Sequence, residues 1–144
     1  MRIRSILLVG VMLLTLAGCG SPTAGKPSPS ATPNISHRPS SPVQISIVSP
    51  TNGEVVHGTT VHVVVQIVGG EIVPNYSSTI DPTHGHVHLY IDNQSIYMSY
   101  TLSQDIPVKP GLTYELHAEW VAADHFPFYP RNVTPNLFFT VAAS

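Results

Sequence analysis

The pattern of apolar and polar residues divides the chain into three parts. Residues 1–18 hold a basic start and a continuous apolar run, residues 19–43 hold few large apolar side chains, and residues 44–144 alternate between apolar and polar positions. Alternation with a period of two is typical of β-strands that bury one face. It predicts strands over residues 44–48, 54–57, 60–68, 85–92, 94–102, 113–121 and 136–142.

The predicted strands belong to one all-β domain, residues 44–144. Its eight prolines fall between the strands, where no ladder hydrogen bond is lost, and no stretch of its sequence carries a helical stripe. This pattern predicts an antiparallel Ig-like β-sandwich of about seven strands, preceded by a signal peptide and a disordered linker. Residues 69–84 and 122–135 then become the B–C and F–G loops, which lie at the same end of such a sandwich.

Residues 1–18 have the pattern of a secretory signal, because Arg2 and Arg4 precede an apolar run shorter than the roughly 20 residues that span a bilayer. The ending Leu-Ala-Gly-Cys at residues 16–19 resembles the lipobox of bacterial lipoproteins. The resemblance implies cleavage before Cys19, lipidation of this residue and an extracytoplasmic domain anchored to a bacterial membrane. Cys19 is also the only cysteine, which excludes an intramolecular disulfide.

Residues 19–43 are interpreted as the lipidated cysteine and a tether. Six prolines and six serines occur between residues 20 and 43. Such a segment buries too little apolar surface to offset the entropy lost on ordering, so it is predicted to be disordered. Its function is to hold the domain away from the membrane.

The charge of the chain is distributed unevenly. The whole chain has a formal charge of −2, but residues 44–144 hold only Lys109 and Arg131 against all eight acidic residues, a formal charge of −6. An acidic surface repels phosphate backbones, so the sequence argues against nucleic acid as a partner.

Histidines form the most chemically suggestive pattern of the domain. His84, His86 and His88 occupy alternate positions where the chain enters the strand 85–92, so they share a face with a spacing of about 7 Å. The strand predicted over residues 113–121, which is strand F of the Ig pattern, is expected to lie beside them and to lead into Asp124-His125. The candidate ligands of a zinc or copper ion are therefore His84, His86, His88, His125, Asp124 and Glu119. The alternative is an exposed polar strand face, and the histidines assigned to the surface or to cross-strand contacts are His57, His62 and His117.

The predicted F–G loop also carries aromatic residues between prolines. Phe126, Phe128 and Tyr129 are candidate contacts for a cell-envelope protein or a glycan. The alternative is that one or two of these rings pack beneath the loop and cover the core.

Two short motifs resemble known secreted bacterial domains. The string Ser-Pro-Thr-Asn-Gly-Glu-Val-Val at residues 49–56 resembles the first strand and turn of secreted bacterial Ig-like domains. Residues 85–92, Gly-His-Val-His-Leu-Tyr-Ile-Asp, and residues 124–127, Asp-His-Phe-Pro, are similar to an uncharacterised bacterial family with a Gly-His-x-His-Leu-x-Ile-Asp strand. The resemblance implies an Ig-like fold and no particular activity.

Enzymatic motifs are missing from the sequence. It lacks the Gly-x-Ser-x-Gly elbow of serine hydrolases, and the spacing of its histidines and glycines does not fit a cupin. The leading hypothesis is a lipid-anchored, extracytoplasmic Ig-like module that binds or presents a partner and does not catalyse. The alternative is a lipoprotein that binds zinc or copper through its histidines.

Overall fold

The computed structural model describes residues 37–143, and the side chains of residues 95–99 are left out of the description. The predicted signal peptide, Cys19 and residues 20–36 of the tether lie outside this part. The described strands are β1 (Gln44–Ser49), β2 (Glu54–Val56), β3 (Thr60–Val68), β4 (Glu71–Ile72), β5 (His84–Ile91), β6 (Gln94–Ser99), β7 (Ser103–Pro107), β8 (Thr113–Ala122), β9 (Pro127–Val133) and β10 (Leu137–Val141). Between residues 37 and 143 there is no helix long and apolar enough to cross a membrane.

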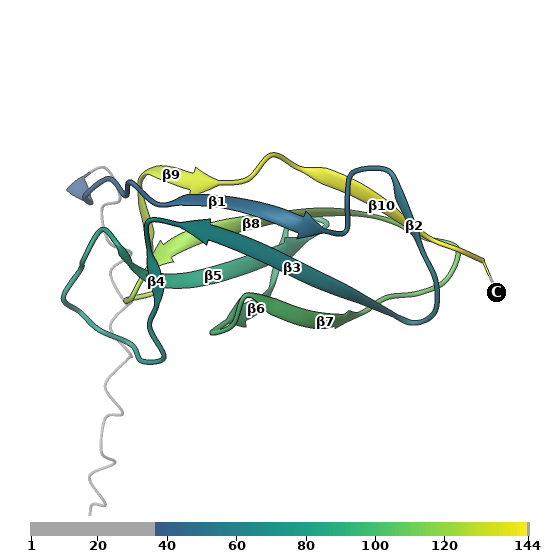
Figure 1. The fold of residues 1–144 in the computed structure, drawn as a ribbon, viewed down its shortest axis with the longest axis horizontal. Coiled ribbons are helices and arrows are strands. Elements are labelled where there is room, and N and C mark those ends of the chain that lie inside the picture. Colours follow the sequence, from purple (N-terminus) through teal and green to yellow (C-terminus); the bar gives the residue numbers. More distant parts are fainter. Residues whose placement is uncertain (1–36, 144) are drawn as a thin grey trace, which may run out of the picture. The chain divides into compact units, whose positions relative to one another are not determined.

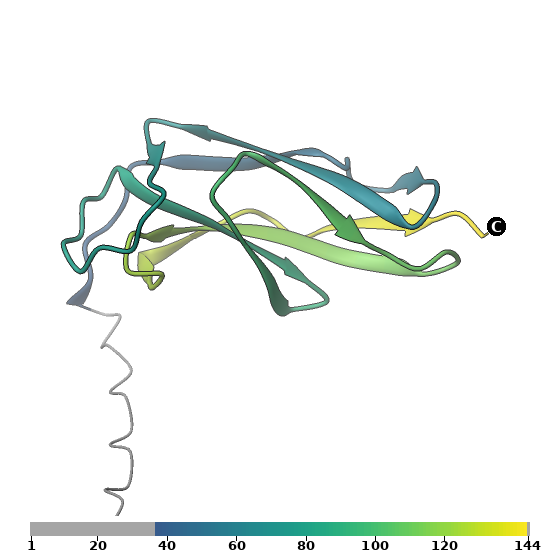
Figure 2. The same cartoon turned by 90° about the horizontal axis from the view of Figure 1, so that it is seen from below.

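The strands form two facing sheets. One sheet has the order β1-β3-β7, and the other has the order β2-β10-β8-β5-β4, with β6 also paired to β5 and β9 also paired to β8. Figure 1 and Figure 2 show them as the two layers of a sandwich, with β1 and β3 in one layer and β5, β8 and β10 in the other. Strands β3, β5 and β8 occupy the B, C and F positions of the Ig fold. The predicted all-β, Ig-like sandwich is confirmed.

The hydrophobic core lies between the two sheets and follows from the alternation of the long strands. From β3, Val61, Val63 and Val65 point inward and are at most 4% exposed. The largest side chains of the core are Trp120, Phe128, Phe139, Leu89, Ile106 and Leu116. Each large apolar side chain buried in this way contributes about 1.5–3 kcal/mol, so the inward face of each long strand stabilises the fold substantially.

Strand β8 is paired along both of its edges, and this corrects the predicted F–G loop. On one edge it pairs with β5 from Gly85↔Ala122 to Ile91↔Leu116. On the other edge it pairs first with β10 and then with β9, so these two strands lie end to end and together take the G position. Residues 122–135 are therefore not one long loop. Prolines are tolerated in β9 because β8 is its strand partner on one side only.

Strand β7 is a further element that the alternation pattern misses, besides β4 and β9. The predicted hairpin strand 94–102 ends earlier, as β6, and the chain then crosses to the other sheet, where β7 pairs with β3. Within β7 only Ile106 is fully buried. A single inward apolar residue is too weak a period-two signal to identify a strand.

The folded domain begins earlier than the predicted boundary at residue 44. Val43 is 3% exposed and belongs to the hydrophobic core. Its carbonyl oxygen accepts a hydrogen bond from Asn132 Nδ2 at 2.5 Å, and the Ser41 hydroxyl donates to the carbonyl of Pro82 at 2.6 Å. The last residues of the predicted tether are therefore docked on the sandwich.

Gly85 provides a test of the central strand pair. A Cβ atom at this position would collide with the carbonyl oxygen of Val121 on β8 and would lie 3.1 Å from Cζ2 of Trp120. Since the collision involves backbone, Gly85→Ala is expected to lower the free energy of unfolding by about 1–3 kcal/mol, the usual effect of overpacking. Urea unfolding measures this change. Ser103→Ala, at an exposed position of β7, is the control, and equal stability of both variants would contradict the close approach.

Candidate functional site

The β8–β9 hairpin places His125 over the larger sheet. The His125 N–H donates to the carbonyl of Ala122 at 2.8 Å, and the Ala122 N–H donates to the carbonyl of Phe126 at 3.0 Å. The Asp124 carboxylate accepts a further bond from the Phe126 N–H at 3.2 Å. His125 closes this turn with a φ of 64°, in the left-handed region where histidine is one of the better tolerated residues.

Three histidine rings lie together on the outer face of the larger sheet, and we call them the histidine cluster: His86, His88 and His125. The rings of His86 and His125 are stacked, with centroids 4.3 Å apart and planes 13° apart. The rings of His88 and His125 are also nearly parallel, and His88 Nε2 lies 3.4 Å from His125 Nδ1. Two strand positions and one hairpin position thus converge, as the histidine and Asp-His pattern predicts.

The histidine cluster is enclosed. His86 is 0% exposed and His88 is 8% exposed, so neither lies on the exposed polar face that was the alternative interpretation. Tyr100 meets the ring of His86 edge-on at 5.1 Å, and Tyr76 lies nearly parallel to His125 at 6.2 Å. The outer face of β5 is therefore covered by the hairpin and by aromatic side chains.

Burial keeps the two strand histidines neutral near pH 7. Burial lowers the pKa of His86, and the charge that His125 carries when protonated lowers it further. Burial and the same charge lower the pKa of His88 to about 4, although the Glu119 carboxylate opposes this shift. Nε2 of His86 lies 3.3 Å from the carbonyl oxygen of Ala123, whereas its buried Nδ1 has no hydrogen-bond partner. The carbonyls of Ala123 and Val73 both face this ring and partly oppose the lowering of its pKa.

Glu119 lies beside the histidine cluster but is engaged elsewhere. Glu119 is the cross-strand partner of His88 in the pairing of β5 with β8, and its carboxylate is completely buried. Arg131 contacts both carboxylate oxygens, at 2.7 and 2.5 Å, and the Tyr90 hydroxyl donates at 3.0 Å. Burial and the Glu119 charge raise the pKa of Tyr90. The ring of His117, which the sequence assigns to the surface or a cross-strand contact, stacks on Tyr90 with centroids 4.6 Å apart.

Asp124 is bound by an arginine that the sequence places in the tether. Arg38 donates to both Asp124 oxygens, at 2.7 and 2.6 Å, and also to the carbonyl oxygens of Pro127 and Phe126. The two side chains are only 7% and 11% exposed. Burial would raise the pKa of Asp124, but the hydrogen bonds and charge of Arg38 outweigh burial and lower it. No sequence signal distinguishes this arginine from a solvated tether residue.

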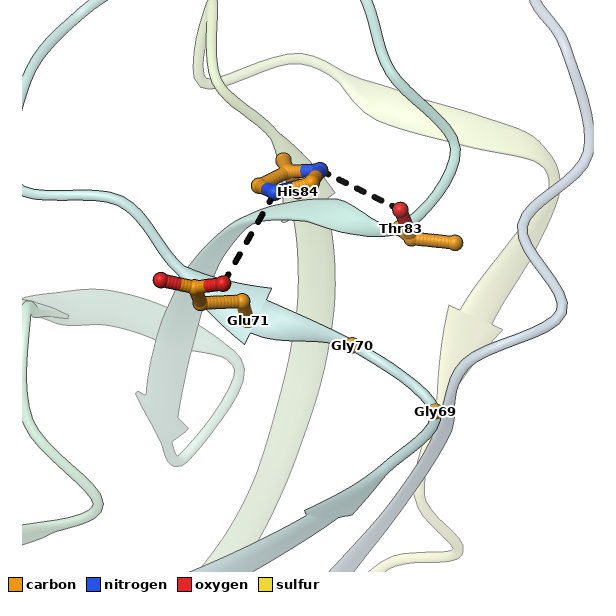
Figure 3. Close-up of a pocket in the computed structure, with 5 residues that line it drawn as sticks. All are labelled: Gly69, Gly70, Glu71, Thr83 and His84. Atoms are coloured by element: carbon orange, nitrogen blue, oxygen red, sulfur yellow. Dashed lines mark hydrogen bonds and ion pairs between the residues drawn. The ribbon is translucent and has the colours of Figure 1, made fainter.

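His84 is separate from the histidine cluster. Figure 3 shows its ring between Glu71 on β4 and Thr83, beside the Gly69-Gly70 turn. The nearest distances are 3.8 Å to the Glu71 carboxylate, 3.3 Å to the Asp81 carboxylate and 3.1 Å to the Thr83 hydroxyl. As arranged in residues 37–143, no group of three or more His, Cys, Asp or Glu side chains is placed to hold a metal ion.

The aromatic residues of the predicted partner-binding loop divide between core and surface. Phe128 is 0% exposed and packs in the core, so it is not a surface contact. The reason is that residues 127–133 form β9, whose inward position Phe128 occupies. Phe126 remains 37% exposed with Arg38 over its ring, and Tyr129 remains 50% exposed.

Removing Arg38 tests whether the end of the tether is part of the folded domain. Arg38→Ala leaves the Asp124 carboxylate nearly buried without its partner, so we expect a loss of about 2–4 kcal/mol of unfolding free energy. Urea unfolding of residues 32–144, which contain the whole compact unit, measures it. Lys109→Ala removes an exposed cation of equal charge and is the control. Equal stability of the two variants would contradict a docked arginine.

The low pKa of His88 predicts a loss of stability on acidification. The unfolded chain takes up a proton near pH 6.5 but folded His88 only near pH 4, so its contribution is complete above about pH 6.5 and is lost as pH falls toward 4. Between about pH 7.5 and pH 5 we expect a loss of about 2 kcal/mol from this residue. His88→Gln should remove that loss in urea unfolding with a chelator present, whereas the exposed His62→Gln should keep it. The same pH dependence in His88→Gln as in the wild type would contradict the prediction.

Comparison with known proteins adds information on the fold. No protein-family model and no curated protein matches the chain. Among solved structures, the chain is similar to fibronectin(III)-like modules of Clostridium thermocellum CbhA, with 19% identity and a TM-score of 0.50. The match covers 70% of this chain and 98% of that chain. At this identity the similarity shows the fold alone: the folded part of the chain is a β-sandwich like those of immunoglobulin and fibronectin type III modules.

Proposed function

We propose that the chain is a bacterial lipoprotein in which lipid on Cys19 anchors an Ig-like module outside a membrane. The module binds or presents a partner and does not catalyse. The observation that carries the proposal is the contact of Arg38 with Asp124, because it attaches the segment leading from Cys19 to one defined end of the sandwich. That end also carries the loop between β4 and β5 and the β8–β9 hairpin, and the C-terminus lies at the other end (Figure 1).

The docked residues define how far the module stands from its anchor. With residues 38–43 on the sandwich, the predicted tether shortens to residues 20–36. Its composition predicts a reach of about 20–25 Å as a coil. The end of the sandwich with the hairpin is therefore the end at which the proposed tether joins the module.

The buried carboxylates support binding rather than catalysis. Glu119 and Asp124 are each held by an arginine through both carboxylate oxygens. A carboxylate engaged in this way is a poor general base, because proton uptake would break the ion pair. The partner surface that we propose consists of Phe126 and Tyr129, whose exposed rings suit an apolar protein surface or the face of a sugar in the cell envelope.

Labelling with palmitate tests the anchor. In a bacterial host we expect label in the wild-type chain and in Ser21→Ala, and no label in Cys19→Ala, since the chain has no other thiol. Cys19→Ala should also leave the membrane fraction. Two results would contradict a lipid anchor: label that persists in Cys19→Ala, or a wild-type chain that carries no label and is released into the culture medium.

Cross-linking in intact cells tests the partner surface. The double variant Phe126→Ser and Tyr129→Ser is expected to lose most adducts with envelope proteins or glycans. Phe138→Ser changes a similarly exposed ring on β10 and is the control. Adducts that are unchanged in the double variant would exclude this surface.

A further inference from the structure

The histidine cluster combines three imidazole donors with a largely enclosed position, and the proposed function does not use it. His86 and His88 project from the outer face of β5, and His125 is brought over them by its hairpin turn. An imidazole placed here loses water without gaining a full set of hydrogen bonds. The unpartnered Nδ1 of His86 is the clearest case, because a buried acceptor without a partner costs about 1–3 kcal/mol.

The distance between two of the rings matches a shared metal ion. Two imidazole nitrogens that bind one tetrahedral zinc ion, each at about 2.0–2.1 Å, lie about 3.4 Å apart. His88 Nε2 and His125 Nδ1 are 3.4 Å apart. Their rings are nearly parallel, so small rotations direct both lone pairs to one point on the open side of the pair.

His86 is the third donor. Its ring stacks on His125, so in this arrangement neither of its nitrogens points to an ion held by the other two rings. The ring is held by one long bond of 3.3 Å from Nε2 to the carbonyl of Ala123 and by a weaker interaction with the carbonyl of Val73. A turn of the side chain that gives up these two contacts and the stacking on His125 would bring one nitrogen lone pair to the site.

We propose that His86, His88 and His125 bind one transition-metal ion, zinc or copper(II). Neutral imidazole suits these ions, and three histidines leave the fourth position for water or an external ligand on the side of His125, which is only partly buried. This inference goes beyond the proposed function and does not depend on the lipid anchor.

The surroundings of the cluster limit the ligands to these three residues. Glu119 and Asp124 are held by Arg131 and Arg38, so moving either carboxylate to a metal would break an ion pair that uses both of its oxygens. Glu119 still places its negative charge beside His88, which raises the affinity of the cluster for a cation. His84 faces Glu71 and Asp81 at the sheet edge and is excluded.

Calorimetric titration of residues 32–144 with zinc chloride and with copper(II) chloride, at near-neutral pH, tests the site. The fragment keeps Arg38 and the compact unit. We expect one ion per chain. In His125→Asn and His88→Gln the affinity should fall by more than about 100-fold, because even groups that only orient a ligand are worth about 10–100-fold. Asparagine is chosen because it tolerates the positive φ of position 125.

His62→Asn is the matched control, since this histidine is exposed and faces Asp105 on the other sheet. It should bind as tightly as the wild type, and copper(II) bound to both should show nitrogen hyperfine structure in electron paramagnetic resonance. Urea unfolding without metal checks that each variant folds. If His88→Gln does not fold, the result for His125→Asn decides the test. No binding by the wild type, or equal binding by His125→Asn and the wild type, would overturn the proposal. Neither result bears on the labelling of Cys19.

Discussion

The pairing of β5 with β8 is the constraint on which the rest of the structure depends. Seven consecutive residue pairs join these strands, and Gly85 lets the two backbones approach so closely that no Cβ fits between them. One face of the pair supplies Leu89 and Trp120 to the core. Because side chains alternate, the same register places His86 and Glu119 on the opposite face. The register of this one strand pair therefore determines both the core and the polar site. A register shift of one residue would exchange the inward and outward faces of the strand.

The outer face of this pair is unusual because it is polar and yet buried. Glu119 has no exposure and depends on Arg131 and Tyr90 for its hydrogen bonds. Burying a carboxylate is costly, and a bidentate arginine offsets this cost only with good geometry. The guanidinium comes from β9, so the end-to-end arrangement of β9 and β10 along β8 allows the Glu119 carboxylate to be buried. The same arrangement leaves the histidine cluster in a position shielded from water.

The β8–β9 hairpin connects the histidine cluster with the tether. Its turn residues Asp124 and His125 are adjacent but point to different partners, Arg38 on one side and the strand histidines on the other. Whatever changes the contact of Arg38 therefore acts on the residue next to His125. In the proposed lipoprotein, the tether would join the sandwich at the end that carries the histidine cluster.

The strands differ in how clearly the sequence pattern identifies them. The alternation of apolar and polar residues identified β3 and β5 and the inward side chains of both strands, although exposure alternates only in β3 and both faces of β5 are buried. Strand β7 escaped because its pattern holds one buried residue, Ile106, and β9 escaped because Pro127 and Pro130 read as loop residues. For the site, strand adjacency was enough to place His125 near His86 and His88. It was not enough to separate His84, or to show that Glu119 and Asp124 are already bound.

Local periodicity and one general rule of Ig topology were enough to predict the sandwich, the adjacent C and F strands and the convergence of His86, His88 and His125. The burial of the outer face, the core position of Phe128 and the contact of Arg38 with the domain became apparent only from long-range packing. The physical reason is the same in each case. The contact partner lies far away along the chain, as with the 86 residues between Arg38 and Asp124, and local sequence patterns do not indicate such contacts.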